Sequence, residues 1–99
     1  MSSSSEHVME TPLHQAVESG NIQAVQELIA KGAKINVRNK NDVTPLHYAA
    51  EGNYVEIADI LLQNGASIDF QSITKRTPLH IGAQFGSVEV VKLLIKNGT

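Results

Sequence analysis

Cysteine is absent from the 99-residue sequence, and so is tryptophan. Without cysteine the chain can form neither a disulfide framework nor a cysteine-based zinc site. A reducing, cytoplasmic environment is therefore the expected location, with the nucleus as a second reading. Aromatic residues make up only 4% of the chain, too few to alternate with basic side chains along a nucleic-acid-binding strip.

Long hydrophobic runs are also missing. No apolar segment approaches the 18 residues needed to cross a bilayer, so we expect no membrane-spanning helix. The first ten residues, MSSSSEHVME, lack the apolar core of a secretory signal, and their polar composition predicts a disordered tail over residues 1–10. The net charge of −2 gives no general attraction to nucleic acid or to anionic lipid. The length predicts one small domain.

The three prolines of the sequence all stand in copies of one tetrapeptide, Thr-Pro-Leu-His. The copies occupy residues 11–14, 44–47 and 77–80, so they recur every 33 residues without insertion. A fixed period of this length is typical of a stacked repeat. The tetrapeptide also fits a helix start, because threonine is a good N-cap and proline suits the first helical position. The leucine then begins the buried stripe.

Each copy of the tetrapeptide is followed by the pattern of two short helices. In the first unit we predict helices over residues 12–19 and 22–31, ended by Gly20 and Gly32. Residues 33–43 then form a polar turn leading to the next unit. Apolar residues recur at helical spacing in the second helix of every unit. They are Ile22, Val25, Leu28 and Ile29, then Val55, Ala58, Leu61 and Leu62, then Val88, Val91, Leu94 and Ile95.

The tetrapeptide followed by paired small residues, as in TPLHYAA at residues 44–50, resembles the ankyrin repeat. The resemblance covers residues 11–99, divided into repeat 1 (11–43), repeat 2 (44–76) and a truncated repeat 3 (77–99). It implies an all-α solenoid of stacked antiparallel helix pairs joined by projecting hairpin turns. It also implies a non-catalytic protein–protein interaction module, a scaffold or adaptor that needs no cofactor. The alternative is a targeting or regulatory segment of a larger enzyme, channel or effector toxin.

Three turn positions depart from the family pattern. Asn53 stands where the other units carry Gly20 and Gly86, and asparagine readily adopts the left-handed conformation that such a turn needs. Ankyrin hairpins usually carry glycine two residues before the threonine, where this chain has Asp42 and Lys75. Lysine is less suited to positive φ, so the hairpin before repeat 3 is predicted to be looser or differently shaped.

The two ends of the row differ in polarity. At two positions where the later repeats are apolar, repeat 1 carries Gln15 and Glu27, which is typical of a capping unit. Repeat 3 shows no such change, since Val88, Leu94 and Ile95 remain apolar. We therefore expect the repeat-3 face to be covered. Further repeats beyond a cut sequence are the preferred reading, and self-association of copies of the chain is the alternative.

Two sets of side chains at repeat spacing invite a chemical interpretation. His14, His47 and His80 should lie about 8–10 Å apart in a stack, too far to share one zinc ion. The ankyrin resemblance implies instead that each histidine bonds its own threonine and links adjacent repeats. Glu18 and Glu51 should be separated by about 10 Å, and no nucleophile–base pair is signalled near them. We interpret them as solvated or partner-facing, and predict no catalytic or metal site.

By the same resemblance, a partner protein would bind at the hairpin tips and on the concave side of the first helices. Aromatic and arginine side chains dominate interface energetics, so Phe85 with Arg76 is the strongest predicted contact. The alternative is that Phe85 folds over the first-helix surface. A third hypothesis is that the basic residues of the turns bind a nucleotide or RNA, which the net acidic charge of the chain disfavours. The predicted partner-binding residues are Lys40, Asn41, Val43, Glu51, Ile73, Thr74, Arg76, Gln84 and Phe85.

Overall fold

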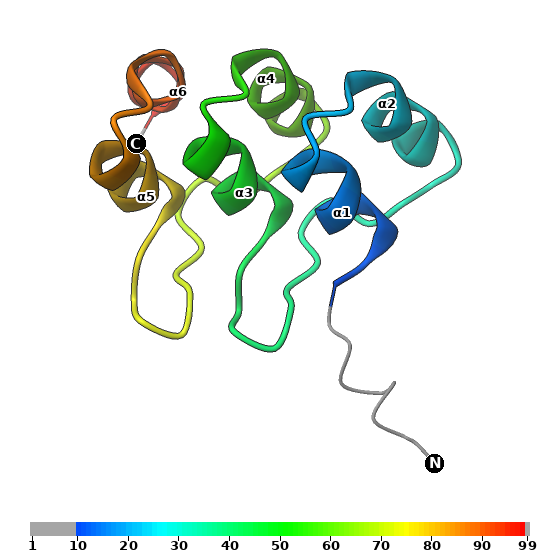
Figure 1. Cartoon of the computed structure of the whole chain (residues 1–99), viewed down its shortest axis with the longest axis horizontal. Coiled ribbons are helices and arrows are strands. Elements are labelled where there is room, and N and C mark those ends of the chain that lie inside the picture. Colours follow the sequence, from blue (N-terminus) through cyan, green and yellow to red (C-terminus); the bar gives the residue numbers. More distant parts are fainter. Residues whose placement is uncertain (1–9, 99) are drawn as a thin grey trace.

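A computed structural model describes residues 10–98, which form six α-helices and no strand (Figure 1). The tail predicted for residues 1–10 therefore lies, apart from Glu10, outside the described residues. The predicted all-α class is confirmed, and the helices predicted in repeat 1 end one residue later than the observed ones. The helices are α1 (Pro12–Glu18), α2 (Ile22–Ala30), α3 (Pro45–Gly52), α4 (Val55–Gln63), α5 (Pro78–Phe85) and α6 (Val88–Lys96).

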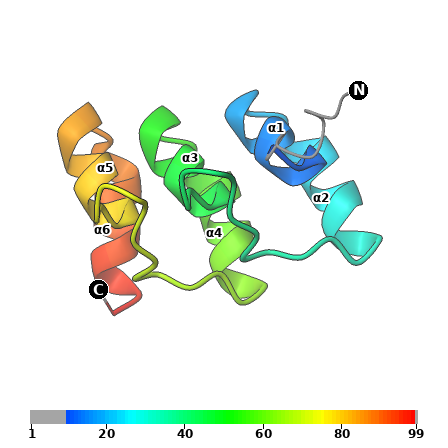
Figure 2. The same cartoon turned by 90° about the horizontal axis from the view of Figure 1, so that it is seen from below.

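The six helices form three pairs that stand in a row (Figure 1). The first helices of the pairs, α1, α3 and α5, lie side by side in one layer, and the second helices, α2, α4 and α6, lie side by side in the other (Figure 2). Hairpins project between successive pairs on the side of the first helices (Figure 1). Because the extensive helix contacts join neighbours, the row itself gives the molecule its shape.

Each first helix begins in the same way. The hydroxyl oxygen of Thr11, Thr44 or Thr77 accepts from the backbone N–H of the histidine three residues later, at 3.2, 3.4 and 3.3 Å. In return, the histidine Nδ1 accepts from the threonine backbone N–H, at 3.3, 3.0 and 3.0 Å. N–H groups at the helix start are thus satisfied reciprocally. The helix start predicted from the tetrapeptide is confirmed.

The core is continuous along the row, and small residues let the helices approach closely. Ala49 and Ala50 of α3 are fully buried. A Cβ added to Gly82 of α5 would lie 2.9 Å from a methyl carbon of Val91, so only glycine fits there without a shift. The buried apolar residues come from all three pairs; they are Leu13, Ala16, Val17, Val25, Leu46, Ala49, Ala50, Ile57, Ala58, Leu61, Val90 and Leu94.

The turn between α3 and α4 uses asparagine as predicted. Asn53 has φ 57° and ψ 39°, in the left-handed region, and the matched Gly20 and Gly86 both have φ 69°. The Asn53 side chain also reaches the next repeat, where Oδ1 accepts from Val90 N at 3.1 Å and Nδ2 donates to the Glu89 carboxylate at 2.8 Å. Glycine could not make these bonds, so the asparagine adds a tie between repeats 2 and 3.

The two hairpins have the same shape. Asp42 and Lys75 both have positive φ, of 59° and 65°. Each hairpin is closed by two backbone hydrogen bonds at matched positions, of 3.0 and 2.9 Å at Asn39 and of 2.9 and 2.8 Å at Ser72. The prediction of a looser or different hairpin before repeat 3 is therefore wrong, because the bonds at Ser72 hold Lys75 in the left-handed conformation.

Replacing Lys75 with glycine should stabilise the fold. A non-glycine residue in the left-handed region costs about 1–2 kcal/mol, whereas the extra freedom of glycine in the unfolded chain costs about 0.5–1 kcal/mol. We expect Lys75→Gly to raise the free energy of unfolding by about 0.5 kcal/mol in urea denaturation. Lys40→Gly, on the other hairpin and without positive φ, should lower it. Equal losses for both variants would contradict this account.

The ends of the row differ as the sequence predicts, with one correction. Gln15 and Glu27 are exposed at the repeat-1 end. At the other end, Val88 and Ile95 are exposed by 52% and 57%. Leu94 is fully buried, because its side chain belongs to the core shared by the pairs, so it is not part of the face that we expected to need covering. That something covers Val88 and Ile95 stays a prediction.

Candidate functional site

Two histidines fasten the hairpins to the helices. His14 Nε2 donates to the Val43 carbonyl at 2.8 Å, and His47 Nε2 donates to the Arg76 carbonyl at 2.9 Å. Each ring accepts at Nδ1 from its threonine, so the proton of the neutral ring lies on Nε2. Burial is the main cause that lowers the pKa of His47, which favours this neutral form. Each bond therefore ties a first helix to the end of the hairpin segment that leads into the next repeat, and the His14 ring also packs against Tyr48 of repeat 2.

The hairpins are also held by their own side chains. Asn39 Oδ1 accepts from the backbone N–H groups of Asn41 and Val43, at 2.8 and 3.0 Å. In the second hairpin, Ser72 Oγ accepts from Arg76 N at 3.3 Å. A backbone bond of 2.8 Å, from Ile73 N to the Asn41 carbonyl, then joins one hairpin to the next. The tips therefore form a connected edge along the row.

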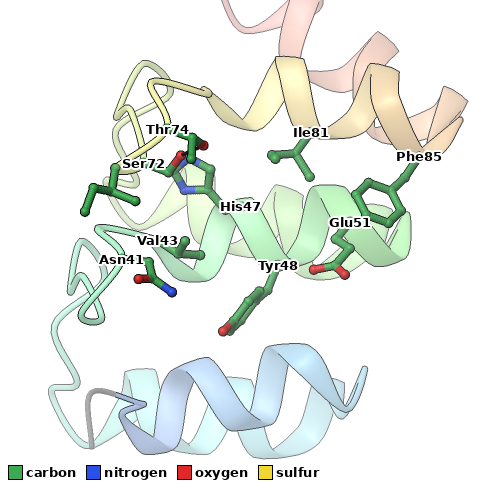
Figure 3. Close-up of a pocket in the computed structure, with 10 residues that line it drawn as sticks. Asn41, Val43, His47, Tyr48, Glu51, Ser72, Thr74, Ile81 and Phe85 are labelled. Atoms are coloured by element: carbon green, nitrogen blue, oxygen red, sulfur yellow. Dashed lines mark hydrogen bonds between the residues drawn. The ribbon is translucent and has the colours of Figure 1, made fainter. Parts of the chain in front are cut away.

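A groove of about 460 Å³ opens between repeats 2 and 3, on the side of the hairpins and the first helices (Figure 3). Part of it lies between the two hairpins, and the rest lies between α3 and α5. Its lining residues are Asn41, Val43, Ser72, Ile73 and Thr74 from the hairpin segments, and His47, Tyr48, Glu51, Ile81 and Phe85 from the two helices.

Phe85 forms the wall of the groove on α5, and its side chain is 52% exposed. The matched positions in the other repeats hold Ser19 and Gly52, so the aromatic ring occurs in repeat 3 alone. The ring and the Glu51 carboxylate face the same part of the groove (Figure 3). Phe85 is therefore available to a partner.

Tyr48 forms the opposite wall and is fixed toward repeat 1. Its hydroxyl donates to Glu10 Oε2 at 2.7 Å, and Asn39 Nδ2 donates to the same carboxylate oxygen at 2.9 Å. The Tyr48 and His14 rings pack in a T-shaped arrangement, with ring centres 5.6 Å apart and planes at 77°. Burial, and then the hydrogen bond to Glu10, raise the pKa of Tyr48. These contacts hold the ring on the repeat-1 side, so the space next to Ile81 stays open.

A second hollow, of about 270 Å³, adjoins the groove at the ends of the first helices. It shares Tyr48, Glu51 and Phe85 with the groove and adds Glu18 and Tyr54. Among the described residues, no lysine or arginine lines either hollow. This end of the site is therefore aromatic and negatively charged.

The structure brings six of the nine predicted binding residues to the groove. Lys40, Arg76 and Gln84 do not line it, and the Arg76 guanidinium donates instead to the Gln84 side chain. Arg76 and Phe85, predicted as one contact, therefore lie in different surroundings. The prediction missed His47, Tyr48, Ser72 and Ile81. The apolar pair among them could have been found, because it occupies the position where repeat 1 carries a polar residue.

The chain matches the family model for ankyrin repeats, in three copies, over residues 13–99. It therefore belongs to the ankyrin-repeat family. Ankyrin repeats are generally protein–protein interaction modules and are typically non-catalytic. A search of curated proteins gave no match to the chain.

Two further findings concern the described part of the chain. Within residues 10–98, every helix is too short or too polar to cross a bilayer. In the same residues, no group of three or more histidine, aspartate or glutamate side chains is arranged to hold a metal ion.

Proposed function

We propose that the chain is a recognition module that binds a segment of another protein in the groove between repeats 2 and 3. The observation that carries this proposal is the half-exposed ring of Phe85, set in a groove whose other walls include Tyr48 and Ile81. Large apolar side chains left open in a concave site are typical of protein interaction surfaces.

The groove is held in its open shape before a partner arrives. His47 fastens one hairpin to α3, Asn39 and Ser72 hold the hairpin tips, and Glu10 holds Tyr48. Ordering loops and side chains on binding costs free energy, so walls that are already fixed leave more of the contact energy for affinity. A role as the targeting segment of a larger enzyme, channel or effector toxin stays a prediction and would use the same groove.

The basic turns support binding of nucleic acid poorly. The Arg38 guanidinium lies over the Phe70 ring, 5.0 Å from its centre, and Arg76 is bonded to Gln84. The basic residues of the two turns are Arg38, Lys40, Lys75 and Arg76, and two of these four are therefore engaged within the fold. None of the four lines the groove. They therefore do not form a basic strip along it that could bind the phosphates of a nucleic acid.

Affinity capture with the wild-type chain and a Phe85→Ser variant tests the proposal. Serine is the residue that repeat 1 carries at the matched position, so the variant should keep its helical circular dichroism. We expect Phe85→Ser to reduce recovery of a specific partner about tenfold, the effect of losing an interface hot spot.

Val55→Ser is the matched control, because Val55 is an exposed apolar residue on α4 outside the groove. This variant should capture the same proteins as the wild type. Identical recovery with the wild type and Phe85→Ser would contradict the proposal.

A further inference from the structure

We propose that the groove selects a basic segment, in which a lysine or arginine stands two positions away from an apolar residue. This inference rests on the proposed function and names the chemistry of its partner. Three features carry it. They are the carboxylates of Glu18 and Glu51, the aromatic ring of Phe85 beside them, and the distance from Phe85 to the apolar part of the groove at Ile81.

The charge of the site is of one sign. Glu51 is the charged residue that lines the groove, and the adjoining hollow adds Glu18. Both side chains are exposed, and neither carboxylate has a hydrogen-bond or ion-pair partner among residues 10–98. Helices α1, α3 and α5 carry no basic residue in their last turns. The carbonyl groups at the C-terminus of a helix carry partial negative charge, and here no basic side chain of the same turn offsets it, so they add to the negative potential at this end.

The aromatic wall favours a cation for a second reason. The ring of Phe85 faces the same space as the Glu51 carboxylate (Figure 3). A lysine or arginine placed there can bond the carboxylate and lie on the ring face, where the negative face of the aromatic ring attracts the cation. The fold already contains one such pair, because the Arg38 guanidinium lies over the Phe70 ring. An acidic side chain would meet repulsion from Glu18 and Glu51 at the same place.

The distance between Ile81 and Phe85 sets the spacing between the apolar and the basic residue of the bound segment. Ile81 lies four residues before Phe85 on α5, which is about 6 Å along the helix axis. An extended peptide advances about 6.6 Å in two residues, and residues two apart point to the same side. A peptide lying along α5 can therefore place an apolar side chain at Ile81 and a basic one at Phe85. A small organic cation alone would leave the apolar part unfilled.

The test is selection from a displayed library of random ten-residue peptides on the full chain. We expect enriched peptides to carry lysine or arginine two positions from an apolar residue. The affinity of the selected peptides, measured by fluorescence anisotropy at low salt, should fall about tenfold in the Glu18→Gln/Glu51→Gln double variant, because charge-assisted hydrogen bonds are lost. Phe85→Ser should also weaken binding by about tenfold. Glu27→Gln, which neutralises an exposed carboxylate of α2 outside the groove, should change nothing.

The outcomes separate this inference from the proposed function. Enriched peptides that bind Phe85→Ser more weakly than the wild type, but carry no basic residue or ignore the Glu18→Gln/Glu51→Gln double variant, would overturn the inference and leave the groove as a binding site. Peptides that bind Phe85→Ser as well as the wild type would overturn both. A selection that enriches no peptide would also overturn both.

Discussion

Leu46→Ala is expected to lower the free energy of unfolding by about 3–4 kcal/mol, a large share of the stability of a domain of this size. The Leu46 side chain is 1% exposed and belongs to the core cluster. Its helix, α3, packs against α1, α4 and α5. Neighbours on several sides cannot all move inward when the side chain is shortened, so most of the cavity would persist.

Leu79→Ala is the matched control for this prediction. Leu79 occupies the same repeat position in α5, where it is only partly buried. Folding removes less apolar surface from water at Leu79, so we expect the free energy of unfolding to fall by only about 1–2 kcal/mol. Urea denaturation followed by circular dichroism measures both variants. Equal losses at Leu46 and Leu79 would show that the contribution of this leucine to the free energy of unfolding does not depend on the place of its repeat in the row.

His47→Ala is expected to cost about 2–3 kcal/mol, the second largest effect. The His47 ring is 2% exposed, accepts from Thr44 N at 3.0 Å and donates to the Arg76 carbonyl at 2.9 Å. Removing it leaves both backbone groups without these partners and frees the hairpin before repeat 3. Because the ring also lines the groove, partner binding should weaken in the same variant.

His80→Ala separates the bond to the hairpin from the helix cap. His80 makes the same cap with Thr77 but is exposed. Loss of the cap alone should cost about 1 kcal/mol. The two variants are compared by urea denaturation at pH 7.5, where the rings are neutral in the unfolded chain. A cost for His80→Ala as large as that for His47→Ala would show that the bond to Arg76 contributes little.

The stability of the wild type should also fall in mild acid. Burial lowers the pKa of His47 in the folded state below the ordinary value of 6.5, so the unfolded chain binds the proton more readily. The stabilisation is present above pH 6.5 and is lost as the pH falls through the folded-state pKa. Denaturation midpoints between pH 7.5 and 5 should decrease, and His47→Gln should decrease less steeply. Parallel slopes for the two proteins would exclude His47 as the cause.

The row of helix pairs could be predicted from the sequence because its signals are local and repeated. Each Thr-Pro-Leu-His predicts a capped helix start, and each cap is present. Asn53 was predicted to be left-handed because its side chain is compatible with that conformation. The same reasoning failed at Lys75, because the propensity of one residue is weak against a hairpin closed by several hydrogen bonds.

The groove could be predicted only in part because it depends on where side chains point. Repeat spacing placed Asn41, Glu51 and Phe85 on the face where the groove lies. It did not show that Arg76 turns to Gln84. The contact of Glu10 with Tyr48 joins residues 38 apart in sequence. Composition alone groups Glu10 with the polar tail and gives no sign of such a pairing.

The restriction of the helix contacts to neighbouring pairs of the row has a consequence for folding kinetics. Each helix pair meets its neighbours, and the bond from Glu10 to Tyr48 already reaches from the start of the described chain into repeat 2. Chains dominated by near-neighbour contacts close only small loops and reach the native state quickly. Repeat 2 is flanked on both sides, so we expect folding to nucleate at α3 and α4 and to propagate outward from there.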